Sequence, residues 1–479
     1  MLAQAPVQNR VLAVDLDGTL ICTDMLYETF WSAFSRNWTT PFVALGGLAA
    51  GRAALKSRLG ALADVDIEKL PYREAIVAYV RQWRADGGRT VLVTASDQAV
   101  ADRVAEHLGI FDEVYGSDGV TNLKGPRKAQ FLAERFGEGG FAYIGDATAD
   151  LPVWKRANEA ITATASSSLR AKVDGLGPPT RHLVEKGVSL KPYAKALRPH
   201  QWLKNALIFL PMMAAHQLSA VTILQAVTAF VVFSMVASSV YLLNDLLDLS
   251  ADRNHARKHK RPFAAGLIPL SHGTILAPLL LAAGFLLAVP LGLKFVLVML
   301  AYYATTMAYS LHLKRRIVID ICVLAGLYTL RILAGGMATD VPLSVWLLAF
   351  SIFFFFSLAA VKRQAELADA LDSNKREASG RGYRAEDLQL ITSMAISSGY
   401  VSVLVMALYT TSSNISSLYR HAYPLWGVCL VLFYWISRMV MITHRRRMHD
   451  DPVVFAVKDR ISHFCLLIIA ALVAASLWP

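Results

Sequence analysis

The sequence predicts an N-terminal α/β domain of the Rossmann-like type and a C-terminal all-α polytopic membrane domain with nine transmembrane helices. Three observations support this division. The chain has 479 residues, which is too long for one ordinary domain. Short apolar strands alternate with helical stretches over roughly the first 160 residues. Beyond residue 200 apolar runs predominate, and 55% of all residues are hydrophobic, which is typical of an integral membrane protein.

Charge and cysteine content narrow the functional classes. The net charge is +12, but the excess Lys and Arg residues fall between the apolar runs, as in cytoplasmic loops, so we expect no nucleic-acid partner. The four cysteines are scattered and no pair has metal-ligand spacing, which indicates neither a disulfide framework nor a zinc site. The N-terminal residues are polar and lack an apolar segment of signal-peptide length, so we expect the first domain in the cytoplasm.

The predicted soluble domain covers residues 1–165. Apolar runs at 11–14, 91–93 and 141–144 are expected to be buried strands. Helical stretches alternate with these strands, which indicates a parallel sheet. Residues 23–85 are largely helical in pattern and form an insert after the first strand.

Residues 166–198 are expected to be a linker, rich in Ser, Gly and Pro at first, followed by a basic helix along the membrane surface. The predicted membrane domain covers residues 199–479 and contains nine apolar segments of membrane-crossing length. They run over 203–218, 220–245, 270–290, 293–312, 317–338, 343–364, 388–409, 423–443 and 461–478.

Positive charge alternates between the connections of the membrane domain. Basic residues precede the first apolar segment and occupy every second connection after it, whereas the opposite loops have little beyond Lys294, Asp340 and Arg420. Since positive charge marks the cytoplasmic side, we expect a multi-pass protein of the inner membrane, with a cytoplasmic N-terminal domain and the C-terminus outside. The basic residues are Lys186, Lys191, Lys195, Arg198, Arg253, Arg257, Lys258, Lys260, Arg261, Lys314, Arg315, Arg316, Lys375, Arg376, Arg381, Arg384, Arg445, Arg446 and Arg447.

Two carboxylates follow the first predicted strand directly. Asp15 and Asp17 lie where open α/β sheets bind ligands, at the carboxyl edge of the sheet. One aspartate can attack a phosphoryl group while the other donates a proton to the leaving oxygen. Two close carboxylates also favour a cation, and Mg²⁺ fits because it prefers oxygen ligands. The alternative is a pair of carboxylates with only a structural role.

Other strand ends supply residues suited to the same site. Asp146 follows the third predicted strand, with Asp150 beyond it, and can complete the magnesium site. Thr94, at the end of the second predicted strand, and Lys128 can hold the remaining phosphate oxygens and neutralise charge in the transfer.

These ordered motifs resemble the haloacid dehalogenase superfamily of phosphatases over residues 11–160. The resemblance implies that Asp15 is the nucleophile and Asp17 the acid and base. It implies that the family's lysine is Lys128, with Lys124 as an alternative, and that the helical insert is a cap that shapes substrate access.

The second apolar segment of the membrane domain ends in a cluster of acids. Asp245, Asp248 and Asp252 are spaced three and four apart, so they share one helical face, with Asn244 beside them. Acids at a helix C-terminus oppose the helix dipole and repel one another. The arrangement favours a cation, and Mg²⁺ with a diphosphate fits a cytoplasmic helix end. The alternative is an exposed acidic helix end paired with nearby arginines.

The acid cluster, followed by Lys258 and Arg261, resembles the first aspartate-rich motif of the UbiA superfamily of intramembrane prenyltransferases. Nine helices also match that family's fold. The family's second aspartate-rich motif is missing, and Lys362, Arg363 and Glu366 stand in its place. The two basic groups are suited to binding a phosphate directly. The alternative is a simple salt bridge between Lys362 and Glu366 at a helix end.

That departure points to one branch of the family. Residues 198–205, which include Trp202 and Lys204, and residues 451–460 resemble decaprenyl-phosphate phosphoribosyltransferases, in a match that covers roughly 195–479. Lys204 is therefore a candidate substrate-binding residue. The alternative is that Trp202 and Lys204 only anchor the helix at the membrane interface.

The resemblances together imply a bifunctional enzyme that uses Mg²⁺. Its membrane domain would transfer 5-phosphoribose from phosphoribosyl diphosphate to a polyprenyl phosphate of the decaprenyl type. Its soluble domain would then remove the 5-phosphate to give polyprenyl-phosphoryl ribose. Two alternatives are an aromatic prenyltransferase that uses prenyl diphosphate, against which the missing second motif argues, and a membrane-anchored phosphatase, against which the acid cluster argues.

Overall fold

The computed structural model describes residues 10–118, 122–183, 189–372, 382–412, 415–448 and 451–477, with no side chains at 416 and 417. The chain divides into two compact units, which are described separately. The first comprises Met1–Leu197 and Tyr241–Ala277, and the second Arg198–Val240 and Pro278–Pro479. Of the residues named for the expected topology, the following lie outside the described residues: Lys186, Lys375, Arg376, Arg381 and Pro479.

A six-stranded sheet forms the centre of the first unit, with strand order β3-β2-β1-β4-β5-β6. Every neighbouring pair of strands is parallel, which confirms the predicted α/β class. The strands are β1 (Val11–Val14), β2 (Arg89–Asp97), β3 (Glu113–Ser117), β4 (Phe141–Gly145), β5 (Glu159–Thr162) and β6 (Thr180–His182).

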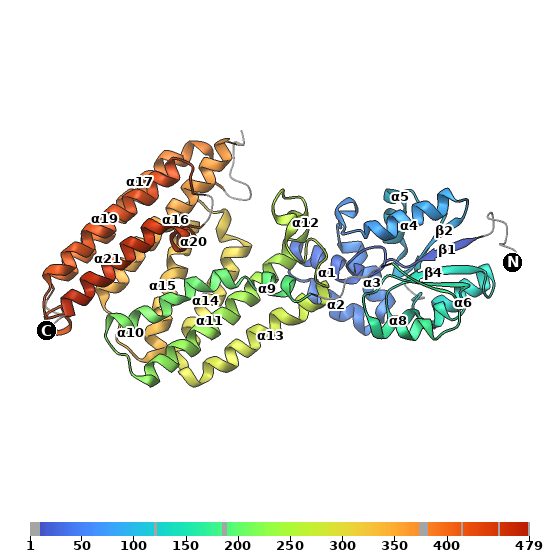
Figure 1. Cartoon of the computed structure of the whole chain (residues 1–479), viewed down its shortest axis with the longest axis horizontal. Helices are drawn as coiled ribbons and strands as arrows, with labels where there is room; N and C mark the ends of the chain where they lie inside the picture. Colours follow the sequence, from blue (N-terminus) through green and yellow to red (C-terminus); the bar gives the residue numbers. More distant parts are fainter. Residues whose placement is uncertain are drawn as a thin grey trace. The chain divides into compact units, whose positions relative to one another are not determined.

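Side chains alternate between the two faces of the sheet, as the pleat requires. Leu12 and Val14 face a core shared with α4 and α5, whereas Val11 and Ala13 face a core shared with α6, α7 and α8. Figure 1 shows α4 and α5 on one side of the sheet and α6 and α8 on the other. The helices are α1 (Met25–Arg36), α2 (Thr40–Ala49), α3 (Arg52–Leu62), α4 (Glu74–Ala85), α5 (Gln98–Leu108), α6 (Pro126–Phe136), α7 (Leu151–Trp154) and α8 (Ser167–Asp174).

Part of the segment expected to be a linker belongs to this fold. Residues 166–198 contain α8 and β6, followed by the helix α9 (Lys191–Leu197). Leu169 and Val173 are four residues apart on one face of α8 and are buried in the core beneath the sheet. The Ser- and Gly-rich composition concealed this apolar pair. β6 is therefore one of three strands, with β3 and β5, that the sequence did not indicate.

The segment Tyr241–Ala277 completes the first unit. It contains the end of α11 (Ala220–Leu247), the short helix α12 (Leu249–Arg253), a 3-10 turn at Lys258–Lys260 and the beginning of α13 (Leu270–Ala288).

The second unit consists of helices, several of which are long and apolar. Counting α11 and α13, eight helices of the described residues have the length and composition to cross a membrane, so the multi-pass membrane fold is confirmed. In Figure 1 the helices α17, α19 and α21 run side by side. The remaining helices are α14 (Leu293–Leu311), α15 (Ile319–Thr339), α16 (Val345–Asp372), α17 (Leu388–Thr410), α18 (Ile415–Leu418), α19 (Tyr423–His444), α20 (Pro452–Lys458) and α21 (Arg460–Leu477).

The expected ninth crossing differs from the other eight. Residues 203–218 do not form one α-helix; the chain there is a 3-10 helix over Pro199–Phe209, followed by α10 (Leu210–Ala214). A 3-10 helix rises about 2.0 Å per residue and an α-helix about 1.5 Å, so this stretch extends for roughly 30 Å in total. That length is comparable to a bilayer core although the α-helical part alone is far too short.

Candidate active sites

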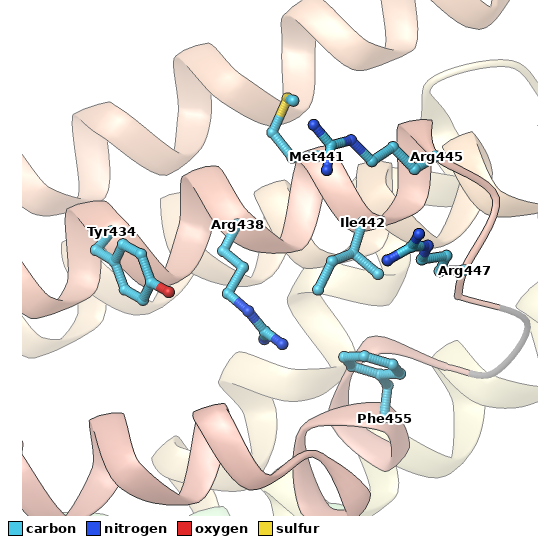
Figure 2. A pocket seen from close by; sticks show the side chains of 7 residues that line it. All are labelled: Tyr434, Arg438, Met441, Ile442, Arg445, Arg447 and Phe455. Atoms are coloured by element: carbon cyan, nitrogen blue, oxygen red, sulfur yellow. The ribbon is translucent and has the colours of Figure 1, made fainter.

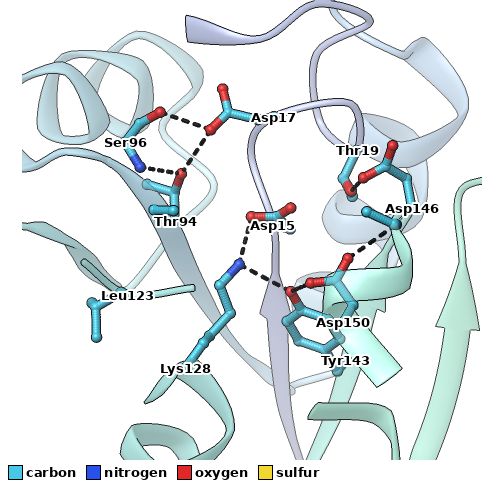
Figure 3. Close-up of polar contacts among 12 residues, drawn as sticks. Asp15, Asp17, Thr19, Thr94, Ser96, Leu123, Lys128, Tyr143, Asp146 and Asp150 are labelled. Atoms are coloured by element: carbon cyan, nitrogen blue, oxygen red, sulfur yellow. Dashed lines mark hydrogen bonds and ion pairs between the residues drawn. The ribbon is translucent and has the colours of Figure 1, made fainter. Parts of the chain in front are cut away.

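Asp15 follows β1 directly and lies at the carboxyl edge of the sheet. Lys128, in the first turn of α6, donates its Nζ to Asp15 Oδ1 at 2.7 Å and to the Tyr143 hydroxyl at 3.1 Å (Figure 3). Lys128 is only 2% exposed and Asp15 is also buried. The ion pair therefore fixes one carboxylate oxygen of Asp15, as a nucleophile with a defined orientation requires.

Three carboxylates meet at this edge of the sheet. One oxygen from each of Asp15, Asp146 and Asp150 lies within 4.8 Å of the others. Thr19 donates its hydroxyl to Asp146 at 3.2 Å, and Tyr143 donates its hydroxyl to Asp150 at 2.8 Å. Figure 3 shows how these two hydrogen bonds hold the carboxylates of Asp146 and Asp150 near Asp15.

The electrostatics of the three carboxylates favour a divalent cation. Burial raises the pKa of Asp15 to about 8, with Lys128 opposing and Asp150 adding to the shift. Burial and the neighbouring Asp150 raise the pKa of Asp146 to about 7. Crowded carboxylate oxygens are the ligands Mg²⁺ prefers, and a divalent charge would relieve their repulsion, so these residues fit a magnesium ion.

Asp17 lies apart from this trio. Its Oδ2 accepts hydrogen bonds from Ser96 at 2.7 Å and Thr94 at 3.3 Å, and its Oδ1 accepts one from the Met25 backbone N–H at 2.7 Å. Asp17 still lines the same cavity as Asp15. The structure thus places Asp17 and the predicted Thr94 together, but it does not bring Asp17 into the carboxylate trio, where Asp150 stands instead.

Two members of the site were not predicted from the sequence. Ser96 is two residues from Thr94 on β2, so the pleat directs both side chains to one face, and this spacing was a signal that could have been used. Tyr143 lies within an apolar strand and gave no such signal, since its hydroxyl acquires its role only through contacts with Lys128 and Asp150.

A cavity of about 640 Å³ opens above Asp15 and Asp17. Lys56, Arg73 and Lys124 line it together with Lys128. Lys128, and not the alternative Lys124, is the lysine bound to Asp15. The cations surround the carboxylates, so an anionic substrate such as a phosphate ester is electrostatically acceptable once a metal is bound.

The acid cluster lies at the end of α11, also in the first unit. Arg261 places one guanidinium nitrogen 3.1 Å from Asp245 and 2.7 Å from Asp252. Both carboxylates are buried, and burial raises the pKa of Asp252 although Arg261 opposes the shift. The structure therefore brings together Asp245, Asp252 and the predicted phosphate ligand Arg261.

Asp248 differs from its two neighbours. It is half-buried at the junction of α11 and α12, and no hydrogen bond or ion pair to its carboxylate occurs among the described residues. Asn244 is half-buried beside it, and Lys258 is exposed on the following 3-10 turn. Arg261 supplies the positive charge between the two buried carboxylates, so the pairing with an arginine, left open by the sequence, is present in this structure.

A second polar cluster lies in the second unit. Lys204 and Lys362 both donate to Asp451 Oδ2, at 2.8 and 3.0 Å. Burial alone would raise the pKa of Asp451, but the two ammonium groups hold it well below the usual carboxyl range, so Asp451 is ionised. Two cations against one anion leave a net positive site, and both lysines were predicted to bind substrate.

A buried arginine extends this cluster. Arg331 of α15 donates to Asn205 at 2.9 Å and to the Tyr302 hydroxyl at 3.0 Å. The Arg331 guanidinium and the Lys204 ammonium both lie over the ring of Tyr328, at 5.7 and 5.6 Å from its centre. Arginine within a membrane helix is costly and usually marks a functional site, but Arg331 was not predicted from the sequence.

Arg363 has a different role from its neighbour Lys362. It is 1% exposed, and its guanidinium contacts Asp320 at 2.5 Å, the Tyr309 hydroxyl at 3.1 Å and Glu366. These partners use its donors within the protein, so the structure gives Arg363 no open position for a phosphate. Glu366 pairs with Arg363. Among the described residues, the salt bridge between Lys362 and Glu366 that the sequence left as an alternative does not form, because Lys362 pairs with Asp451.

An apolar cavity of about 350 Å³ has Lys204 among its lining residues. Side chains of the 3-10 helix, α10, α16, α19 and α20 line it, and they are almost all apolar. The aromatic members are Phe350, Phe354, Phe355 and Trp435. An apolar cavity with one cation in its lining suits an amphiphile with a charged head and a hydrocarbon tail.

A further cavity of about 400 Å³ lies at the end of α19 (Figure 2). Arg438, Arg445 and Arg447 line it together with Phe455. Arg438 forms a two-fold ion pair with Asp459, at 2.6 and 3.0 Å. Arginines near one end of a membrane helix are expected on its cytoplasmic side, and the orientation stays a prediction.

Comparison with known proteins identifies both halves of the chain. A model of the UbiA prenyltransferase family matches residues 205–455, and a model of haloacid dehalogenase-like hydrolases matches residues 12–155. The uncharacterized protein y4nM of Sinorhizobium fredii is 39% identical over 465 residues, which cover 96% of this chain and 90% of that protein. The match therefore includes both domains.

Other relatives match the membrane half. Nodulation protein NoeC of Azorhizobium caulinodans is 36% identical over 277 residues, which cover 57% of this chain and 90% of that protein. Decaprenyl-phosphate phosphoribosyltransferase of Mycobacterium tuberculosis is 42% identical over 182 residues, which cover 36% of this chain and 59% of that protein. Among solved structures, a UbiA homolog from Archaeoglobus fulgidus bound to GPP and Mg²⁺ gives a TM-score of 0.47 at 15% identity, over 59% of this chain and 99% of that one.

Proposed function

The chain belongs to the UbiA prenyltransferase family and joins to it a haloacid dehalogenase-like hydrolase domain, and from this premise we propose a two-step enzyme. The membrane domain transfers 5-phosphoribose from phosphoribosyl diphosphate to a polyprenyl phosphate. The soluble domain then removes the 5-phosphate and gives polyprenyl-phosphoryl ribose. Both steps take place on the cytoplasmic side of the inner membrane.

The apolar cavity lined in part by Lys204 is the observation that carries this proposal. A polyprenyl phosphate has a long hydrocarbon tail and a single anionic head. The apolar cavity accepts the first isoprene units, and Lys204 and Lys362 attract the phosphate. Their present counter-ion, Asp451, holds both ammonium groups, and one carboxylate between two lysines leaves one positive charge in excess. The resemblance to decaprenyl-phosphate phosphoribosyltransferases, at 42% identity, agrees with this acceptor.

The acid cluster serves the donor. Asp245, Asp248 and Asp252 supply carboxylates for the magnesium of a phosphoribosyl diphosphate, and Arg261 supplies a charge for its phosphates. An oxygen of the lipid phosphate attacks ribose C1, a new C1–O bond forms, and the bond from C1 to the diphosphate breaks. The positive charge that develops on the ribose ring is favoured by the anionic neighbourhood of this cluster.

The phosphatase step uses the residues around Asp15. Its carboxylate attacks phosphorus, and the bond from phosphorus to ribose O5 breaks while Asp17 gives a proton to that oxygen. Water then attacks the phosphorus and gives a proton to Asp17, which releases inorganic phosphate and restores Asp15. Lys128 holds the nucleophile, and a Mg²⁺ bound by Asp15, Asp146 and Asp150 would neutralise the phosphate oxygens.

Mass spectrometry of the lipid product tests the two steps together. Full-length protein in lipid bilayers would receive phosphoribosyl diphosphate, a polyprenyl phosphate and Mg²⁺. Wild type should yield the ribosylated lipid, whereas Asp15→Asn should accumulate the same lipid with one more phosphoryl group, because it lacks the nucleophile but keeps nearly the same side-chain size. Asp86→Asn, a change at an exposed acid after α4, is the matched control and should behave as wild type.

Two results would contradict the proposal. If wild type and Asp15→Asn both yield the phosphorylated lipid, the phosphatase acts on another substrate. If phosphoribosyl diphosphate gives no lipid product while a prenyl diphosphate and an aromatic acceptor do, the membrane domain is an aromatic prenyltransferase.

A further inference from the structure

The segment Tyr241–Ala277 packs against the soluble half of the first unit through several specific contacts. Arg253 of α12 donates two hydrogen bonds to the Glu28 carboxylate of α1, at 3.0 and 2.6 Å. Trp31 donates its indole N–H to Thr274 at 2.9 Å. Asn254 donates to Asp66 at 3.2 Å. These contacts join the predicted cap to the segment that carries the acid cluster.

The ion pair between Arg253 and Glu28 is buried, with side chains 6% and 3% exposed. A buried two-fold pair has a fixed geometry, because a shift of either side chain would leave a charge without a partner. Gly266 tightens the packing further: a Cβ there would lie 2.7 Å from Cys22 and 2.9 Å from Pro71. The turn that follows Gly266 is therefore held firmly against the phosphatase.

That turn forms a wall of the phosphatase cavity. Pro269, Leu270 and Ser271 line the same cavity of about 640 Å³ as Asp15 and Asp17. Leu270 is also the first residue of α13, a helix with the length and composition to cross a membrane. The wall thus includes the N-terminal end of a candidate membrane helix, so a membrane that takes up this helix would lie beside the cavity.

We infer that the Pro269–Ser271 turn makes the phosphatase specific for a phosphate ester carried on a membrane lipid. A lipid-linked substrate can lay its head group along this wall while its tail stays in the bilayer, whereas a free sugar phosphate has no part that reaches the wall. The inference rests on the proposed function and adds the specificity element: a segment of the transferase completes the phosphatase site.

Two phosphate esters test the inference with the full-length protein. Ribose 5-phosphate is the free ester, and phosphoribosylated polyprenyl phosphate in phosphatidylcholine bilayers is the lipid-linked one. Phosphate release gives kcat/KM for each. Wild type should prefer the lipid-linked ester by roughly tenfold or more, a ratio that reports differential transition-state binding.

Ser271→Phe should remove this preference. The larger side chain narrows the cavity beside the wall, where the lipid-linked ester would lie. Its kcat/KM should therefore fall by roughly tenfold, while kcat/KM for ribose 5-phosphate should change by less than about twofold. Leu267→Phe is the matched control, because Leu267 is 58% exposed on the same turn and does not line the cavity. It should keep the wild-type preference.

The ion pair offers a second, independent variant. Glu28→Gln should also lower the preference, since it weakens the hold on the turn, and the exchange of both charges, Glu28→Arg with Arg253→Glu, should restore it at least in part. The rate with ribose 5-phosphate shows in each case that the Asp15 site is intact.

The outcomes separate this inference from the proposed function. If wild type hydrolyses neither ester, the proposed phosphatase step is wrong and the inference falls with it. A second outcome is that wild type hydrolyses the lipid-linked ester while Ser271→Phe shows the same preference as Leu267→Phe, or has kcat/KM lowered equally for both esters. In either case the proposed function stands and the wall has no role in specificity.

Discussion

Lys128 shows how burial sets the chemistry of a single residue. Burial alone would lower its pKa, but the carboxylates of Asp15 and Asp150 outweigh burial and raise it, so the ammonium stays charged. Tyr143 donates to Asp150, and burial raises its pKa well above the usual phenol value, so it remains a donor. The site therefore keeps one fixed cation and one fixed donor among its three carboxylates.

Magnesium binding at this site should depend on pH. Because the pKa values of Asp15 and Asp146 are raised to about 8 and about 7, the metal-free site binds protons that Mg²⁺ must displace. Lowering the pH therefore weakens the binding of Mg²⁺, by up to about tenfold per unit of pH for each proton displaced. The apparent Mg²⁺ constant for hydrolysis of para-nitrophenyl phosphate should be clearly weaker at about pH 6 than at about pH 8.5. Equal constants would mean that the carboxylates are ionised without the metal.

Asp248 is the most informative residue of the acid cluster, because its carboxylate has no partner among the described residues. Asp248→Asn should raise the activation free energy of lipid phosphoribosylation by on the order of 3 kcal/mol, because stabilisation of the leaving group is lost. The rate should fall by roughly a hundredfold. Turnover of para-nitrophenyl phosphate should not change. Asp340→Asn is the control, since it removes an acid that is 91% exposed. Normal transferase activity in Asp248→Asn would show that the cluster is structural.

Individual residues also show how far the sequence could predict the sites. Asp15 and Thr94 were found because strand ends converge in a parallel sheet, whereas Lys128 was identified through the family resemblance. Tyr143 and Arg331 were missed because each lies within an apolar run, where only three-dimensional contacts reveal a polar role. Arg363 was taken for a phosphate ligand because sequence cannot show which of two adjacent basic residues faces the protein interior.

At the scale of an element, α16 places two adjacent basic residues in different surroundings. Arg363→Met should destabilise the protein by about 3 to 5 kcal/mol, because Asp320 would be left buried without its charged partner. Lys362→Met should change stability by less than about 1 kcal/mol, since Lys204 still pairs with Asp451. Thermal unfolding in detergent compares the two variants.

Transferase activity completes this comparison. Lys362→Met should lower activity by roughly tenfold or more, because the lipid phosphate loses a cation. If Arg363→Met is as stable as Lys362→Met, the network around Arg363 does not support α16.

Short elements mark the limits of prediction at this scale. The long apolar helices were predicted within a few residues because length and hydropathy identify them, except that α16 was expected to end at 364 and continues to Asp372. α8 and β6 were taken for a linker, since two buried apolar residues in a Ser- and Gly-rich stretch give a weak pattern. Residues 203–218 were expected to be one membrane-crossing helix, but hydropathy does not distinguish a 3-10 helix from an α-helix.

At the scale of the whole molecule, the buried pair between Glu28 and Arg253 restricts the membrane topology. It joins the soluble domain to the connection between α11 and α13, so both must lie on one side of the membrane. The chain between them must therefore cross an even number of times. If α11 is one crossing, we expect residues 199–214 to be the other, and their length of roughly 30 Å is sufficient.

This topology gives the last prediction. Single cysteines would be placed in a variant that lacks the four native ones, and intact cells would be treated with a membrane-impermeant maleimide. Cysteines at Lys294 and Pro479 should be labelled, because an odd total of nine crossings brings the C-terminus outside. Cysteines at Arg257 and Arg446 should be protected until the membrane is opened, because positive loops stay in the cytoplasm. If Arg257 and Lys294 are labelled alike, α13 does not cross the membrane. If Arg257 is protected but Pro479 is also protected, the number of crossings after Arg257 is even, and one of the helices from α13 to α21 lies along the membrane surface instead.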